Sequence, residues 1–78
     1  MYTNKELWTA ACLNDIKTLK EYYSNSGKPG IRIYSAGKFQ SLIYGAYLNK
    51  NFEIVRYLVE VGETIEPHEN YIDLDNYR

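Results

Sequence analysis

The chain has 78 residues, of which 24% are charged, and its formal net charge is −1. This length fits one domain with a small core, and the near-neutral charge does not favour a nucleic-acid-binding protein. Its single cysteine, Cys12, excludes an internal disulfide, which fits a reducing compartment. No apolar run approaches the roughly 18 residues of a membrane span, and no N-terminal signal segment is recognisable. We therefore expect a cytoplasmic protein without a membrane partner.

The first part of the chain predicts two short helices. Thr3 and Glu6 have the spacing of a capping box, which predicts a helix start near Asn4. Asn14-Asp15 predicts a break followed by a new N-cap, with a second helix over residues 15–23. Since so little chain separates the two helices, they should be antiparallel neighbours.

The middle of the chain predicts a loop and then an extended segment. Residues 24–30 read SNSGKPG, a typical loop composition. Residues 31–38 read IRIYSAGK, which alternates apolar with polar residues at first and carries a turn signal at Ala36-Gly37. We expect a hairpin-like extended loop here.

A second helix pair is predicted after this loop. Ser41 to Leu48 is a compact apolar block, and Asn51 offers an N-cap for the helix that follows. That helix carries an apolar stripe, and Gly62 suits the position just after its end. The stripe consists of Phe52, Val55 and Val59, widened by Ile54 and Leu58.

The C-terminal segment differs from the rest in charge. Residues 1–59 hold eight Lys and Arg against four Asp and Glu, a net charge of +4, whereas residues 60–78 hold six acids and one arginine, a net charge of −5. Pro67 suits the first position of a short helix. We expect the regularly spaced acids to be solvated; these are Glu60, Glu63, Glu66 and Glu69.

The two helix pairs align with each other as an internal repeat. Leu7-Trp8-Thr9-Ala10-Ala11 aligns with Ile43-Tyr44-Gly45-Ala46-Tyr47, and Thr18-Leu19 aligns with Ile54-Val55. The chain thereby resembles ankyrin-repeat proteins, whose repeat is about 33 residues with a T-P-L-H-x-A opening. Residues 41–46 read SLIYGA, similar to that opening, and residues 53–62 match the second helix and closing glycine. Asn14 and Lys50 stand where the family usually has glycine.

The resemblance implies an all-α, ankyrin-like fold with two antiparallel helix pairs joined by an extended hairpin loop. In this single domain, residues 1–78, repeat 1 covers about 4–30, the hairpin 31–38, repeat 2 about 39–66 and the acidic tail 67–78. It also implies that a protein partner docks on the turn tips and the inner helices. The residues expected there are Arg32, Tyr34, Ser35 and Lys38 on the hairpin, and Thr9, Leu13, Tyr47, Leu48 and Asn49 on the helices.

No pattern predicts catalysis, a cofactor or a metal site. Cys12 and His68 are single residues of their kind, and one such pair does not make a metal site. We expect a non-catalytic module that binds and inhibits a partner protein. Its size and its Asn-, Lys-, Ile- and Tyr-rich composition suggest a phage or viral accessory protein acting on a host defence system. The alternative is a cysteine-dependent enzyme or redox-sensing protein that uses Cys12.

The tail is also expected to take part in self-association. A two-repeat stack leaves both ends open, and repeat arrays bury their apolar faces on neighbours. Apolar residues such as Leu7 and Trp8 would then be exposed. Either the tail caps the second repeat or it docks on another copy, and we expect a homodimer. The contacts should come from Tyr71, Ile72 and Leu74.

Overall fold

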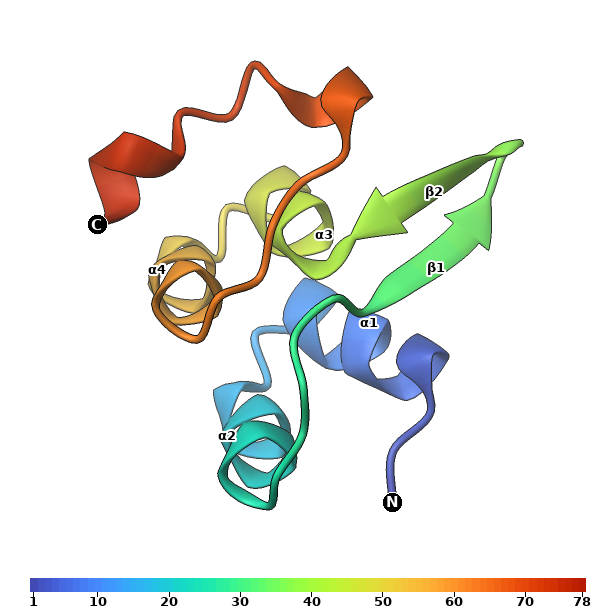
Figure 1. The fold of residues 1–78 in the computed structure, drawn as a ribbon, viewed down its shortest axis with the longest axis vertical. Helices are drawn as coiled ribbons and strands as arrows, with labels where there is room; N and C mark the ends of the chain where they lie inside the picture. The colour runs from blue at the N-terminus through green and yellow to red at the C-terminus, as the bar shows by residue number, and fades with distance from the viewer.

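The computed structural model describes all 78 residues as two helix pairs with a β-hairpin between them (Figure 1). The C-terminal segment packs back over the second pair. The elements in chain order are α1 (Asn4–Cys12), α2 (Ile16–Ser24), β1 (Arg32–Ser35), β2 (Lys38–Ser41), α3 (Leu42–Leu48), α4 (Phe52–Glu60) and the 3-10 helices η1 (Pro67–Glu69) and η2 (Leu74–Tyr77).

The predicted helix starts in the first pair are confirmed. Thr3 Oγ1 accepts from the Glu6 amide at 3.1 Å, and Glu6 accepts in return from the Thr3 amide at 2.8 Å. Asp15 caps α2 by accepting from the amide and the hydroxyl of Thr18 at 3.3 and 2.7 Å. These hydrogen bonds lower the pKa of both carboxyls, because they stabilise the charged form.

The expectation of an all-α fold is wrong, because the structure is a mixed α/β fold, 53% helical and 10% strand. The segment expected as an extended loop forms one strand, β1. Its partner β2 runs to Ser41, into residues that were assigned to the second helical block. Arg32 pairs with Ser41 and Tyr34 pairs with Phe39 in an antiparallel register.

The predicted turn at Ala36-Gly37 closes this hairpin. Ala36 has φ 54° and Gly37 has φ 79°, as a type I′ turn requires at its two central residues. Such a two-residue turn matches the twist of the flanking strands. The strand pairing therefore follows from the local turn signal together with residues 39–41. The sequence analysis had assigned these three residues to the second, helical repeat.

The core lies between the two helix pairs. Trp8 of α1 packs on Gly45 of α3, where a Cβ atom would lie only 2.8 Å from the indole ring. Leu7, expected at an exposed end, is completely buried, and Phe52, expected in the buried stripe, is 47% exposed. The buried apolar residues are Leu7, Ala10, Ala11, Leu19, Leu42, Ile43, Ala46, Ile54, Val55, Leu58 and Ile72.

Asn51 joins the two pairs instead of capping its own helix. It stands at the N-cap position of α4, but its side chain makes no capping hydrogen bond. The amide Nδ2 donates to the carbonyl oxygens of Ala11 and Cys12, at 2.9 and 3.0 Å. These carbonyls belong to the last turn of α1, which has no helical donors for them.

The tail packs on its own chain. Ile72 is only 2% exposed, and Leu74 and Tyr77 are partly buried against the core. In Figure 1 the tail runs from α4 past the α3 end of β2 and returns beside α4. None of the helices has both the length and the apolar character needed to cross a membrane.

Candidate protein-interaction surface

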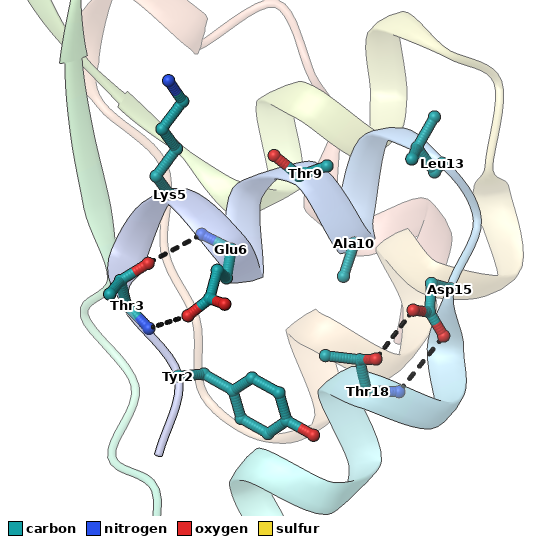
Figure 2. Close-up of a pocket in the computed structure, with 9 residues that line it drawn as sticks. All are labelled: Tyr2, Thr3, Lys5, Glu6, Thr9, Ala10, Leu13, Asp15 and Thr18. Atoms are coloured by element: carbon teal, nitrogen blue, oxygen red, sulfur yellow. Dashed lines mark hydrogen bonds between the residues drawn. The ribbon is translucent and has the colours of Figure 1, made fainter.

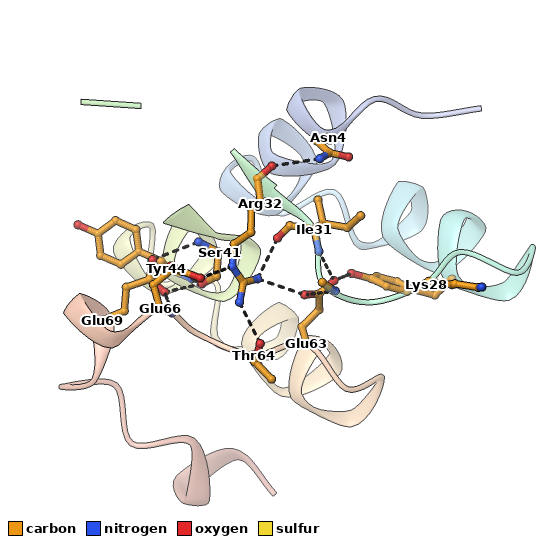
Figure 3. A network of polar contacts seen from close by, with 12 residues as sticks. Asn4, Lys28, Ile31, Arg32, Ser41, Tyr44, Glu63, Thr64, Glu66 and Glu69 are labelled. Carbon is orange, nitrogen blue, oxygen red and sulfur yellow. Dashed lines mark hydrogen bonds and ion pairs between the residues drawn. The ribbon is translucent and has the colours of Figure 1, made fainter. Parts of the chain in front are cut away.

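The base of the hairpin is held by two buried glutamates that the sequence analysis expected to be solvated. Glu63 is 3% exposed and Glu69 is fully buried. Burying an unpaired carboxylate is costly, so each must be compensated by donors from elsewhere in the fold. These donors come from residues far away along the chain, and Figure 3 shows how the carboxylates and their partners meet at the hairpin base.

Glu63 holds the entry to β1. Its carboxylate accepts from the Tyr23 hydroxyl at 2.5 Å and from the amides of Gly30 and Ile31 at 3.0 and 3.4 Å. Burial, followed by the hydrogen bond to Glu63, raises the pKa of Tyr23, so the phenol stays a donor at physiological pH. Through these bonds Glu63 ties α2 and the loop before β1 to the end of α4.

Glu69 holds the end of β2. It accepts from the Ser41 amide at 3.1 Å, from the Ser41 hydroxyl at 2.6 Å and from the Glu66 amide at 3.0 Å. Ser41 in turn caps α3 by accepting from the Tyr44 amide at 3.1 Å. Beside it, Nε2 of His68 lies 2.8 Å from the Phe39 carbonyl, so this nitrogen donates to β2. His68 thus holds the strand, whereas the sequence analysis gave it no role.

Arg32, expected on the partner surface, is instead part of this bracing. Its Nε lies 2.7 Å from Glu66, its NH2 donates to the Thr64 hydroxyl at 2.9 Å, and its NH1 lies 3.7 Å from Glu63. The side chain is 19% exposed, and its charge is compensated within the chain. It is therefore not available as a free cation for a partner.

The far half of the hairpin carries the exposed residues. Tyr34 is 66% exposed and Phe39 is 54% exposed, and their rings form an edge-to-face pair with centroids 5.0 Å apart. Ser35 and Lys38 are also exposed and flank the turn. In Figure 1 this half extends beyond the helical body. Three of the four predicted hairpin residues thus lie together at the tip, and Phe39, which was assigned to the second repeat, joins them.

A groove of about 530 Å³ separates the hairpin from α1. Lys5 lines it and makes no ion pair with any carboxylate of the chain, and the same holds for Lys38 at the tip. No acidic residue lines the groove. Its lining residues are Asn4, Lys5, Trp8, Arg32, Ile33, Tyr34 and Ser35. We call this the hairpin groove.

The helix residues predicted for the partner surface are split between two places. Thr9 and Leu13 line a second groove, of about 420 Å³, on the face of α1 and α2 shown in Figure 2. Tyr47, Leu48 and Asn49 lie at the end of α3 instead. There Tyr47 packs edge-to-face against Phe52 and Tyr71, with ring centroids 6.0 and 5.9 Å apart, and the Asn49 amide donates to the Gly45 carbonyl at 2.8 Å. The predicted helix residues do not form one surface with the hairpin.

The residues predicted for self-association also divide. Tyr71 is 57% exposed, whereas Ile72 is buried in the chain's own core and Leu74 is partly buried against it. Ile72 therefore cannot contact a second copy without unfolding the tail. Of the two roles that the sequence allowed for the tail, the structure shows the cap on the second helix pair.

The surroundings of Cys12 oppose a reactive thiolate. The cysteine is partly buried at the end of α1, and burial raises the pKa of its thiol, whereas reactive cysteines have a lowered pKa. No basic side chain contributes to that pKa. His68 contacts β2 instead.

Comparisons with known proteins add no identification. No protein-family model, curated protein or solved structure matches this chain.

Proposed function

We propose that this protein is a non-catalytic module that binds a partner protein through the tip of its hairpin and inhibits the partner by covering its surface. The observation that carries the proposal is the exposed Tyr34–Phe39 pair on a hairpin whose base is held by buried carboxylates. The resemblance to ankyrin-repeat proteins, which rests on the sequence alone, supports the same class. A phage or viral accessory role in the cytoplasm belongs to the proposal on compositional grounds.

The bracing favours binding because a two-stranded hairpin is only marginally stable by itself in water. Here Glu63, Glu66, Glu69 and His68 hold its base through the contacts described above. Ordering a flexible loop on binding costs about 0.5–1.5 kcal/mol per immobilised side chain. A hairpin that is already fixed avoids part of that cost.

The exposed aromatic pair supplies the contact energy. Large aromatic side chains dominate many protein interfaces, and their exposure here leaves apolar area that a partner would bury. Burial recovers about 25 cal/mol for each Å² of apolar surface removed from water. The neighbouring Lys38 is a free cation that would help to select an acidic partner surface.

The competing class is chemistry at Cys12. Its partial burial and the raised pKa of its thiol disfavour this reading. A Cys12→Ser variant separates the classes, because a pure binder keeps its activity and a cysteine-dependent enzyme or sensor loses it with the fold intact.

The test of binding is a quantitative pull-down from the native host with the tagged full chain. The Tyr34→Ala, Phe39→Ala double variant should lose the captured protein. A matched control is the Leu48→Ala, Phe52→Ala double variant, which also removes two exposed apolar side chains, 54% and 47% exposed, but away from the hairpin. Equal capture by both double variants and the unchanged chain would exclude the hairpin tip as the binding surface.

A further inference from the structure

The two edges of the hairpin differ in how their backbone groups are satisfied. Ser35 and Lys38 are paired across the type I′ turn, the place where the first carbonyl of such a turn accepts from the fourth amide. Because hydrogen-bonded and non-hydrogen-bonded pairs alternate along antiparallel strands, the next pair, Tyr34 and Phe39, is not hydrogen-bonded to each other. Both residues direct their N–H and C=O groups to the outer edges of the hairpin.

On the β2 edge, side chains of the tail occupy two of the outward groups, the carbonyl of Phe39 and the amide of Ser41. The carbonyl of Phe39 accepts from His68 at 2.8 Å, and the amide of Ser41 donates to Glu69 at 3.1 Å. The tail therefore lies along β2 where a third strand would pair, and it obstructs strand addition at that edge.

On the β1 edge, only the base is occupied. The carbonyl of Arg32 accepts from the side-chain amide of Asn4 at 3.1 Å. The next outward pair, the N–H and C=O of Tyr34, has no hydrogen-bond partner among the side chains, loops or turns of the chain. Tyr34 itself lines the hairpin groove, together with Lys5 and Trp8 among others, so the free edge of β1 borders this groove.

We propose that an extended segment of the partner pairs with the free edge of β1 and adds a third strand to the hairpin; this inference rests on the proposed binding function. The segment alternates acidic with apolar residues. Strand addition to an open sheet edge is a common mode of peptide recognition, in which backbone hydrogen bonds give affinity and alternate side chains give specificity. The groove beside β1 gives the added strand a place to lie.

The alternation follows from the two faces of the hairpin. Successive side chains of a strand point to opposite faces, so an added strand extends both faces of the hairpin, one that carries Tyr34 and Phe39 and one that carries Ser35 and Lys38. The first face favours apolar residues, since it presents the exposed aromatic pair. The second face, with Lys38, and the groove, with Lys5, present cations without ion-pair partners, and therefore favour carboxylates.

This chain's own tail is not the occupant. Residues 72–75 read IDLD and alternate in the required way, but Ile72 is buried in the core of its own chain. A second copy would have to unfold its tail to offer that segment. A separate partner protein with an exposed acidic strand therefore fits the edge better.

The test uses a phage-displayed library of random linear peptides selected on the full chain, followed by affinity measurements on the enriched peptides. Tyr34→Pro and Tyr34→Ala form a matched pair, since both lack the ring and only the proline lacks the outward N–H. Proline is tolerated at the outer edge of a strand. We expect acidic-apolar peptides that bind the proline variant about tenfold more weakly than the alanine variant.

A second measurement keeps the test decisive should the proline variant not fold. In the unchanged chain, hydrogen exchange at the Tyr34 amide should slow when an enriched peptide saturates it. Unaltered exchange overturns the proposal, and so does equal binding by the two Tyr34 variants. An absence of enriched peptides, peptides without acidic residues, or preferential binding of single-stranded oligonucleotides each overturns it as well. A dimer of the unchanged chain that Tyr34→Pro abolishes would overturn the choice of partner.

The failure of this proposal is distinguishable from failure of the binding function. If Tyr34→Ala and Phe39→Ala weaken capture of the host partner while Tyr34→Pro weakens it no further than Tyr34→Ala, the hairpin binds through its side chains alone. If none of the three weakens capture, the hairpin is not the binding surface and both proposals fall.

Discussion

The two helix pairs have the same construction, but their outer faces differ: that of the first pair is open and that of the second pair is covered by the tail. Each pair has a turn residue in the left-handed region between its helices, Asn14 in the first and Lys50 in the second, with φ values of 62° and 58°. The outer face of the first pair is an open groove with polar residues such as Thr9 and Thr18 (Figure 2). The second pair is covered by the tail through the buried Ile72. A short chain of two helix pairs can thus cover one end with its own tail and leave the other end open.

Removal of residues 67–78 should have the largest effect on stability, because it uncovers the second helix pair. The truncated chain loses the buried Ile72 and the carboxylate that holds β2. Loss of a buried isoleucine side chain costs about 2–5 kcal/mol, and an unpaired buried polar group adds about 1–3 kcal/mol. We expect the melting temperature to fall sharply in a circular dichroism scan. An unchanged melting temperature would mean that the second helix pair needs no cover.

Glu69→Ala should have the next largest effect. The variant leaves the amide and hydroxyl of Ser41 and the amide of Glu66 without their acceptor, and we expect the free energy of unfolding to fall by about 3 kcal/mol in urea denaturation. Glu60→Ala is the control, because Glu60 is exposed and should change stability by no more than about 0.5 kcal/mol. Similar losses in both variants would contradict the bracing role.

Gly45→Ala tests the contact between the two pairs. The new methyl group would lie 2.8 Å from the Trp8 ring, so either the ring leaves its preferred rotamer or α1 and α3 move apart, at a cost of about 1–3 kcal/mol. The smaller, aliphatic side chain of the Trp8→Leu background should relieve part of this loss. A double-mutant cycle measures the relief, and strictly additive effects would show that the two residues do not contact each other.

The smallest change in stability is expected from glycine substitutions in the two turns between paired helices, at Lys50 and Asn14. A non-glycine residue in the left-handed region costs about 1–2 kcal/mol, and asparagine tolerates it better than most residues. Lys50→Gly should therefore stabilise the chain by about 0.5–1 kcal/mol, and Asn14→Gly by less. The urea midpoints of the two variants show which substitution stabilises the chain more. A larger gain from Asn14→Gly than from Lys50→Gly would contradict the idea that Lys50 is the more strained of the two residues.

The helices and the turn could be predicted because their signals are local. Thr3 with Glu6, and Ala36 with Gly37, lie within three residues of each other. The buried glutamates could not be predicted in this way, since Glu63 meets Tyr23 and Glu69 meets Ser41, 40 and 28 residues away. A partial signal was present at Glu66-Pro67 and Glu69, whose spacing is that of a capping box with proline at the first position. From this spacing one could have predicted that the Glu69 carboxylate accepts from a backbone amide and is not in solvent.

The same limit applies to the candidate site. Tyr34, Ser35 and Lys38 were placed on the hairpin by the turn signal, and they are exposed there. The ion pair and hydrogen bond of Arg32 could not be predicted, because its partners Glu66 and Thr64 lie more than 30 residues further on. The free edge of β1 depends on which backbone groups the tail and α1 occupy, and the sequence pattern does not contain that information.

The packing of Trp8 has a practical consequence for fluorescence. It is the only tryptophan of the chain, and it both contacts Gly45 of the second helix pair and lines the hairpin groove. Its emission should therefore respond to two separate events. Separation of the helix pairs exposes the indole to water and shifts the emission to longer wavelength, whereas a peptide seated beside β1 changes its intensity in a chain that remains folded. One unlabelled protein sample thus reports both unfolding and occupancy of the groove.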